Sequence, residues 1–471
     1  MNLAAERKRR GAWYTPQGLV DTVVDAVVTP SFIASRGGHL RIVDPACGDG
    51  RFLRAAVARV VAHGGTAHVV GVDVDGVAVN GTRRTLADTP VGVTSDVIEA
   101  DSLTMDWAAL GPASFDLVVG NPPFLSQMAA ATTRGGASDR GGGPYADAAV
   151  EFLALGAELV DSDGGRVAFV LPQSLLAARD AGAIRALYDE RAELVWSRWT
   201  GDRDFDAQVV TCVLAFEFGG ARRDREGGGW ARVVTSRRGV PDVPLVVGEQ
   251  GAGRVGDRAR LNANFRDEYY GMVGAVGDHT SGPPLITSGL IDPGRTRWGE
   301  RPVTFAKRRF LRPRLDLSQL DDRMARWAEQ RLVPKVLVAN QTTIIEAVAD
   351  PDGAWLPGVP VVAAYPVAAE GVPTAWEIAA VLTSPVASAW AWHRSAGTGL
   401  SADAIRVGPT LLADLPWPGG DLAGAVRALR AGDVRRCALG VDAAYGISEP
   451  DDDELSGWWL AALDRIEARG R

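Results

Sequence analysis

Residues 40–53 read LRIVDPACGDGRFL, a stretch that indicates the class of fold. A largely apolar run at 40–43 ends at Asp44, and a turn with glycines at positions 48 and 50 follows. Apolar residues then recur at helical spacing over residues 51–65, which end in glycine. Because glycine lets the backbone approach a bound molecule closely, the stretch predicts a strand, a ligand-binding turn and a helix.

Similar apolar runs continue through the first half of the chain, and helical patterns separate them. They occupy residues 67–75, 115–120, 166–172 and 209–218. Apolar strands that alternate with helices are typical of a parallel or mixed sheet covered on both faces. Such sheets bind ligands at the carboxyl ends of their strands. We therefore expect the turns that follow Val43, Val72 and Val119 to form the site.

The chain changes character at residues 222–229, which read RRDREGGG. Ten of the 14 tryptophans lie from Trp230 onward, and the alternation of strands and helices is lost there. We expect two domains, with residues 1–225 forming the α/β domain and residues 226–471 a second domain of different architecture.

Composition and charge limit the class of protein. With 46% hydrophobic and 23% charged residues, the chain has the composition of an ordinary globular protein. No apolar run approaches the roughly 18 residues of a membrane helix, and the charged N-terminus does not resemble a secretory signal. Three cysteines and five scattered histidines form neither a disulfide framework nor a metal cluster. We expect a cytoplasmic protein with no membrane partner and no metal.

Acidic residues follow successive strands of the predicted sheet. Asp44 can accept from a cationic amino group, Asp73 from ribose hydroxyls, and Asp101 from an adenine amino group. The turn differs from the dinucleotide fingerprint because Leu53 stands where a third glycine belongs. Each acid alone also fits a surface or helix-capping role. Together they favour S-adenosylmethionine over a nicotinamide dinucleotide.

A rigid loop, NPPF, follows the strand at 115–120 and comprises Asn121, Pro122, Pro123 and Phe124. The Asn121 side-chain carbonyl and the Pro122 backbone carbonyl, restrained by Pro123, can accept from the two hydrogens of an exocyclic aromatic amine. Phe124 can stack on the base, which leaves the duplex at a cost of a few kcal/mol. The loop indicates direct methyl transfer to that amine, without a covalent enzyme intermediate.

These motifs resemble those of the γ-type adenine-specific DNA methyltransferases, close to the Eco57I and TaqI-type enzymes. Residues 11–24, GAWYTPQGLVDTVV, resemble the N-terminal cofactor motif of that family. The resemblance implies a Rossmann-like α/β domain with a mixed seven-stranded sheet, dependent on S-adenosylmethionine, and a C-terminal α+β target-recognition domain. The cofactor-binding residues that it implies are Tyr14, Thr15, Pro16, Asp44, Ala46, Gly48, Gly50, Phe52, Asp73 and Asp101.

The second half contains a local basic region that the net charge of −8 conceals. Residues 295–314 hold eight basic residues against a single acid, Glu300, with aromatic residues between them. This composition fits phosphate contacts and stacking, and it also fits an ordinary solvated face. The residues expected to contact double-stranded DNA are Arg295, Arg297, Lys307, Arg308, Arg309, Arg312, Asn340 and Gln341. Asn340 and Gln341 can read adenine edges or equally satisfy backbone groups.

The predicted reaction is methylation of the amino group of adenine at a specific duplex site. The resemblance implies a restriction–modification or phage-defence role, in which a separate endonuclease or other defence proteins are partners. Methylation of RNA or of a protein glutamine remains open, because those enzymes also use Asn-Pro-Pro-aromatic loops. A non-catalytic DNA-binding or sensor subunit is a further alternative. Cytosine carbon-5 chemistry is disfavoured, because Cys47 lies in the cofactor turn.

Overall fold

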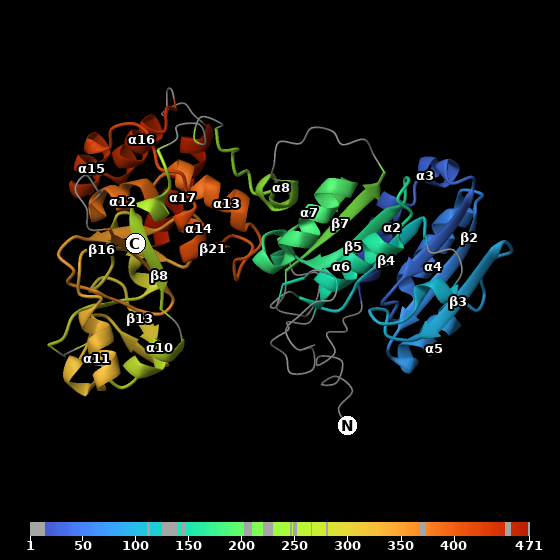
Figure 1. The fold of residues 1–471 in the computed structure, drawn as a ribbon, viewed down its shortest axis with the longest axis horizontal. Helices are drawn as coiled ribbons and strands as arrows, with labels where there is room; N and C mark the ends of the chain where they lie inside the picture. The colour runs from blue at the N-terminus through green and yellow to red at the C-terminus, as the bar shows by residue number, and fades with distance from the viewer. Residues whose placement is uncertain are drawn as a thin grey trace. The chain divides into compact units, whose positions relative to one another are not determined.

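The structure is a computed structural model. It describes residues 15–110, 114–124, 140, 142–143, 147–201, 210–219, 229–244, 247, 252–264, 266–278, 281–367, 374–447 and 454–469. The chain forms two compact units, Met1–Val233 and Val234–Arg471, and each is considered by itself (Figure 1). The expected boundary at 225/226 falls between described segments.

A seven-stranded sheet forms the centre of the first unit, in the order β3-β2-β1-β4-β5-β7-β6. β7 runs antiparallel to β5 and β6, and the other neighbouring pairs are parallel. The strands are β1 (His39–Asp44), β2 (Thr66–Asp73), β3 (Val93–Glu99), β4 (Leu117–Gly120), β5 (Arg166–Pro172), β6 (Ala192–Arg198) and β7 (Thr211–Phe218). The predicted mixed sheet is confirmed.

Helices cover both faces of this sheet. Helices α2 (Gln17–Val27) and α4 (Arg51–Ala62) share a core with Ala168 and Val170 of β5. The alternate β5 residues, Val167 and Phe169, meet α6 (Ala148–Leu159) so closely that a Cβ on Gly156 would lie 3.0 Å from each side chain. The other helices are α3 (Pro30–Ser35), α5 (Gly76–Thr85), α7 (Gly182–Arg191) and α8 (Gly229–Thr235), the last of which crosses the division between units.

The topology brings the carboxyl ends of the central strands to one edge of the sheet. β1 and β4 are parallel neighbours, so Asp44 and Gly120 end adjacent strands at the same edge. β2 ends there as well, at Asp73, and lies on the other side of β1. The turns that follow these three strands can therefore line one site, as the sequence predicts.

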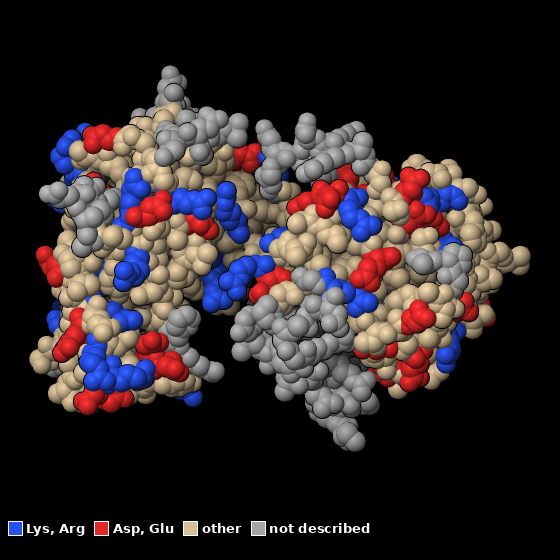
Figure 2. All heavy atoms as spheres, in the orientation of Figure 1, with Lys and Arg blue, Asp and Glu red and all other residues tan. Residues whose placement is uncertain are grey.

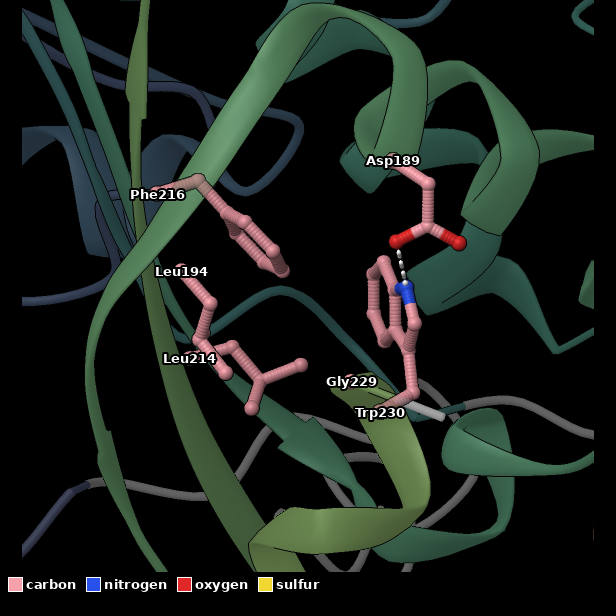
Figure 3. Close-up of a pocket in the computed structure, with 6 residues that line it drawn as sticks. All are labelled: Asp189, Leu194, Leu214, Phe216, Gly229 and Trp230. Carbon is pink, nitrogen blue, oxygen red and sulfur yellow. Dashed lines mark hydrogen bonds between the residues drawn. The ribbon is translucent and has the colours of Figure 1, made fainter. Parts of the chain in front are cut away.

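A shallow hollow lies elsewhere in this unit, between α7, α8 and the strands β6 and β7 (Figure 3). Leu194, Leu214 and Phe216 form its apolar side, and the Trp230 indole donates to Asp189 Oδ1 over 2.8 Å on the opposite side. The Phe216 and Trp230 rings lie 5.0 Å apart. Because this hollow lies along β6 and β7 and not at the ends of β1, β2 and β4, it is separate from the predicted cofactor site.

The second unit is built on a four-stranded antiparallel sheet, β18-β16-β20-β8. Its strands are β8 (Ala259–Ala263), β16 (Lys335–Ala339), β18 (Ala347–Asp350) and β20 (Val361–Pro366). Two-stranded pairs are β9 (Val276–Gly277) with β15 (Arg314–Leu315), β10 (Leu285–Ile286) with β19 (Leu356–Pro357), β11 (Ile291–Asp292) with β12 (Arg295–Thr296), β13 (Val303–Phe305) with β14 (Arg308–Phe310), and β17 (Gln341–Thr342) with β21 (Ile405–Arg406).

Helices complete this α+β unit, as predicted. They are α10 (Arg266–Met272), α11 (Asp322–Glu329), α12 (Ala375–Leu382), α13 (Pro385–Ser395), α14 (Pro409–Ala413), α15 (Ala423–Arg430), α16 (Val434–Ala444) and α17 (Glu454–Arg469). Short 3-10 helices in the two units are Trp107–Leu110, Gln173–Leu176, Arg179–Ala181, Val255–Asp257, Ser288–Leu290 and Leu317–Gln319. Among the residues that the structure describes, no helix is both long enough and apolar enough to cross a bilayer.

Candidate active site

The turn between β1 and α4 is held by its neighbours and open on one side. Cys47 N–H donates to Val72 O and Gly48 N–H to Asp73 Oδ2, both over 2.9 Å. Gly48 and Gly50 have φ angles of 55° and 78°, a region that side chains rarely adopt. A Cβ on Gly50 would lie 2.9 Å from Thr82 Cγ2, whereas a Cβ on Gly48 would meet no atom within 4 Å. A ligand can therefore lie directly against the backbone at Gly48.

Asp44 is a buried acid at the head of this turn, and its side chain is 1% exposed. Its Oδ1 accepts from the Ala46 N–H over 3.0 Å. The pKa of Asp44 is raised to about 8, chiefly by burial; the Ala46 hydrogen bond opposes this rise, and the charges of Asp73 and Asp49 contribute to it. A carboxyl in such surroundings ionises readily only beside a cation. The site thus fits the positively charged amino group of S-adenosylmethionine.

Asp73 supports the turn from the end of β2. Its two carboxylate oxygens accept from the backbone N–H groups of Gly48 and Asp75, each over 2.9 Å. Burial raises the pKa of Asp73, and these two hydrogen bonds offset part of the rise. Asp73 thus fixes the backbone of the glycine turn. The sequence did not reveal this role, which is additional to the predicted ribose contact.

Asp101 follows β3 and lies on a segment that is tied to the same turn. Its Oδ1 accepts from Leu103 N–H over 3.0 Å. The next residue, Ser102, is buried and donates to Pro45 O over 2.6 Å. The structure thus brings Asp44, Asp73 and Asp101 to the ends of three adjacent strands, β1, β2 and β3.

The NPPF loop begins at the end of β4, beside Asp44. A Cβ on Gly120 would lie against the Asp44 carboxylate, 3.0 Å from its Cγ, so glycine permits this close approach. The Asn121 side chain donates from Nδ2 to Thr15 Oγ1 over 3.0 Å. Pro122 is buried, Pro123 is half-buried, and the half-buried Phe124 packs against the main core of the unit.

Arg51 and Asp49 are site residues that sequence reasoning missed. Arg51 binds Asp49 through two nitrogen–oxygen contacts of 2.9 and 2.5 Å, and it also donates to the backbone carbonyl of Thr15. Arg51 is the first residue of α4, where the helix dipole disfavours a cation. The sequence signal that could have revealed this pair is an arginine at the start of a helix, two residues after an acid.

The remaining predicted cofactor residues differ in their surroundings. Pro16 is exposed and precedes α2, and Ala46 is half-buried in the turn. Phe52 is buried in the main hydrophobic core. Tyr14 lies outside the described residues. Cofactor contact stays a prediction for all four.

Cys47 has the properties of a core residue. Its thiol is buried and accepts a hydrogen bond from Thr82 Oγ1 over 3.6 Å. Burial and the nearby Asp44 charge raise the pKa of this thiol. A thiol that stays protonated is a poor nucleophile, which agrees with the prediction against cytosine carbon-5 chemistry.

The basic region of the second unit includes an exposed hairpin, β13–β14. Ala306 and Lys307 connect its strands with φ angles of 48° and 63°, as in a two-residue turn with both residues left-handed. Arg308 lies over the Phe310 ring at 5.2 Å, and Arg309 pairs with Thr304 across the ladder. Exposed members of the predicted DNA set are Arg295, Lys307, Arg308, Arg309 and Arg312. Figure 2 shows basic side chains in several groups on the visible face of this unit.

Arg297 has a different role from the expected phosphate contact. Its guanidinium is buried and binds Asp292 Oδ2 at 2.5 Å and Glu300 Oε2 at 3.1 Å. Burial opposes the charge, but the hydrogen bonds to both carboxylates outweigh it and raise the pKa of Arg297. This arginine is part of an ion-pair network within its unit, because Asp292 also binds Arg301.

The two amides proposed to read bases also bind the backbone of their own unit. Asn340 is buried and donates from Nδ2 to Val407 O over 2.8 Å. Gln341 Oε1 accepts from Leu400 N–H over 3.0 Å. These contacts match the alternative of satisfied backbone groups, most clearly for the buried Asn340.

Comparisons with known proteins relate parts of this chain to methyltransferases. Residues 1–192 match the family model described as N-6 DNA Methylase. Over 303 residues the chain is 26% identical to the Type II methyltransferase M.TthHB8I of Thermus thermophilus, covering 60% of this chain and 58% of that protein. Over 99 residues it is 40% identical to the ribosomal RNA large subunit methyltransferase G of Streptomyces griseus, covering 21% and 23%. The chain thus spans less than two thirds of either relative.

Among solved structures, a type I restriction-modification system methyltransferase subunit from Streptococcus thermophilus is 21% identical, with 44% of this chain and 45% of that chain covered and a TM-score of 0.36. That likeness is too low to carry an argument. The family match, the glycine turn and the buried acid nevertheless identify S-adenosylmethionine as the cofactor. Residues 1–192, the part of the chain that matches the N-6 DNA methylase model, contain the cofactor turn and the NPPF loop.

Proposed function

We propose that this protein methylates the exocyclic amino group of adenine at a specific site in duplex DNA. The observation that supports this most is the NPPF loop at the end of β4, next to the cofactor turn, with the Asn121 amide nitrogen bound to Thr15. S-adenosylmethionine supplies an electrophilic methyl group on its sulfonium sulfur. The chain's own part is to position an amine and to make its nitrogen nucleophilic.

The loop offers two acceptors for that task. Because Asn121 Nδ2 donates to Thr15, the amide oxygen is the atom that can accept from a substrate amine. The Pro122 carbonyl is the second acceptor, and the ring of Pro123 restrains it. Two acceptors that bind both amine hydrogens localise the nitrogen lone pair, which is otherwise delocalised into the aromatic ring. Their dipoles also stabilise the positive charge that develops on that nitrogen.

A base inside a duplex cannot reach this loop, so the proposal includes extrusion of the target adenine. Phe124, half-buried at the end of the loop, is the proposed stacking partner. In the second unit we propose DNA phosphate contacts for the exposed residues Arg295, Lys307, Arg308, Arg309 and Arg312. We propose a base contact for Gln341. We no longer propose a phosphate contact for Arg297 or a base contact for Asn340.

The proposed setting is restriction–modification or another defence against foreign DNA, in the cytoplasm. The Thermus relative is named a Type II methyltransferase, which supports this setting. A separate endonuclease or other defence proteins are the proposed partners.

The test is transfer of tritiated methyl groups from S-adenosylmethionine to DNA that lacks adenine methylation, by the wild type and Asn121→Ala. We expect incorporation by the wild type and its loss in the variant, while cofactor and DNA binding persist. A non-catalytic sensor would bind DNA and transfer nothing in either form.

RNA methylation is the second candidate, favoured by the 40% identity to a relative named as a ribosomal RNA methyltransferase. The same assay with protein-free ribosomal RNA separates the candidates. Incorporation into RNA and none into DNA would identify RNA, and not DNA, as the substrate.

A further inference from the structure

Thr15 is a buried residue that connects the N-terminal segment to two other parts of the site. It lies in a loop before α2 and is 3% exposed. Its hydroxyl accepts from Asn121, 106 positions along the chain, and its backbone carbonyl accepts from Arg51 at the start of α4. One residue thus contacts both the cofactor-turn helix and the catalytic loop.

The backbone of Thr15 is held firmly enough to act as a fixed point. The Arg51 guanidinium donates to the Thr15 carbonyl, and it also binds both carboxylate oxygens of Asp49. A cation at a helix start is unfavourable, and the Asp49 carboxylate offsets this cost. In addition, the Leu19 and Val20 N–H groups donate to Pro16 O, so α2 begins two residues after Thr15.

The Asn121 amide needs such a fixed partner. An amide that rotates by half a turn exchanges its acceptor oxygen and its donor nitrogen. In the wrong orientation, N–H groups of Asn121 would face N–H groups of the substrate amine. The main chain before Asn121 is restrained by the contact between Gly120 and Asp44, but this contact does not fix the side-chain torsions.

We infer that Thr15 is a positioning residue, whose hydroxyl holds the Asn121 amide so that its oxygen faces the amine to be methylated. This role rests on the proposed function, and it is distinct from the cofactor contact expected of Thr15. It acts through Asn121 and adds no group that touches the reacting atoms.

The kinetic test compares Thr15→Val, which removes the hydroxyl at nearly constant volume, with Thr15→Ser, which keeps it. Thr22→Val is the matched control, because Thr22 is exposed on α2 and donates only to its own helix at Gly18 O, over 2.7 Å. Single-turnover methyl transfer is measured at saturating S-adenosylmethionine and DNA. Misplaced catalytic groups lower rates by as much as about 100-fold, so we expect a loss of about 10- to 100-fold for Thr15→Val.

We expect the KM for S-adenosylmethionine to change little in Thr15→Val, and we expect Thr15→Ser and Thr22→Val to behave as the wild type. A wild-type rate in Thr15→Val would overturn the inference. So would a raised KM for S-adenosylmethionine with an unchanged rate at saturation, because Thr15 would then serve cofactor binding alone. Thr15→Ala, which also lacks the hydroxyl and adds no volume, replaces the valine variant if that variant does not fold.

A second measurement does not depend on catalysis. With nitrogen-15 in asparagine, the Asn121 side-chain NH2 signals are assigned by their loss in Asn121→Ala. We expect Thr15→Val to shift these signals and speed their hydrogen exchange, and Thr15→Ser to restore them. Unchanged signals in Thr15→Val would refute the inference even if the wild type methylates DNA. If the Asn121 signals shift in Thr15→Val as expected but the wild type methylates no DNA, the proposed function would be refuted instead.

Discussion

At the scale of single residues, Asp44 links the turn between β1 and α4 to the NPPF loop. It is buried, it accepts from Ala46, and it leaves no space for a side chain at Gly120. A strand ending in an acid before a glycine turn was visible in the sequence. The contact with Gly120 was not, because it depends on the parallel pairing of β1 with β4.

The first prediction concerns the pH dependence of stability in the cofactor-free protein. The pKa of Asp44 is raised from 3.8 to about 8, so the folded state holds a proton that the unfolded state has lost. Stability must then fall as pH rises between those values, by at most about 1.4 kcal/mol per pH unit. Asp44→Asn removes this contribution.

Urea unfolding gives the free energy of unfolding of both proteins at pH values from about 5 to about 8. This range lies between the unfolded and folded pKa values of Asp44. We expect the stability of Asp44→Asn relative to the wild type to increase steadily with pH. A constant difference across the range would show that Asp44 is already ionised in the folded protein.

The second prediction concerns Gly120. Gly120→Ala places a Cβ against the Asp44 carboxylate, so either the loop or the acid must shift. We expect loss of methyl transfer together with weaker S-adenosylmethionine binding, measured by calorimetry. Gly182→Ala is the control, because its Cβ would meet no atom closer than 3.9 Å, and we expect full activity from it. Normal cofactor binding by Gly120→Ala would contradict the proposed coupling.

At the scale of elements, local patterns predicted the first unit well. The run at 166–172 forms β5 over the same residues, and the run at 209–218 forms β7 from Thr211. These strands are buried on both faces, so their sequences are apolar throughout. β6, an edge strand of the sheet, is half-buried, and no such run marks it.

The second unit was less predictable because its sequence carries fewer recognisable signals. The β13–β14 turn uses Ala306 and Lys307 where such turns usually hold asparagine and glycine, so the hairpin carries no turn signal. Arg297 and Asn340 look like exposed polar residues in the sequence. Their partners, Asp292 and Val407, become evident once the strands are placed.

The third prediction concerns α8. Trp230 is buried between Phe216 and Asp189, so Trp230→Ala should lower the free energy of unfolding of the first unit by about 3 kcal/mol (Figure 3). Trp230→Phe keeps most of the apolar contact and loses the hydrogen bond, at a cost of about 1 kcal/mol. Urea unfolding followed by circular dichroism gives both values. Equal losses would mean that the hydrogen bond, and not the apolar contact, anchors the helix.

The fourth prediction concerns the hairpin. Lys307→Gln removes one proposed phosphate contact, so DNA binding should weaken for all sequences and the salt slope of log K should fall by about 1. Ala306→Gly is the control, because it keeps every charge and suits the left-handed backbone at φ 48°. Fluorescence anisotropy at several salt concentrations measures the DNA affinity and its salt slope for each protein. An unchanged slope in Lys307→Gln would place the DNA elsewhere.

At the scale of the whole molecule, net charge is a poor guide to the partner. The chain carries −8, yet residues 295–314 carry eight basic residues and one acid. A local basic region attracts a polyanion even when the total charge is negative. The mixed-sheet class of the first unit was predictable from the sequence, whereas the proposed target site in DNA depends on contacts that composition does not encode.

The most direct test of DNA adenine methylation is nucleoside mass spectrometry of DNA from cells that lack adenine methylation and express this protein. We expect N6-methyladenine with the wild type and none with Asn121→Ala. Methylation of another base, or equal methylation with both proteins, would contradict it.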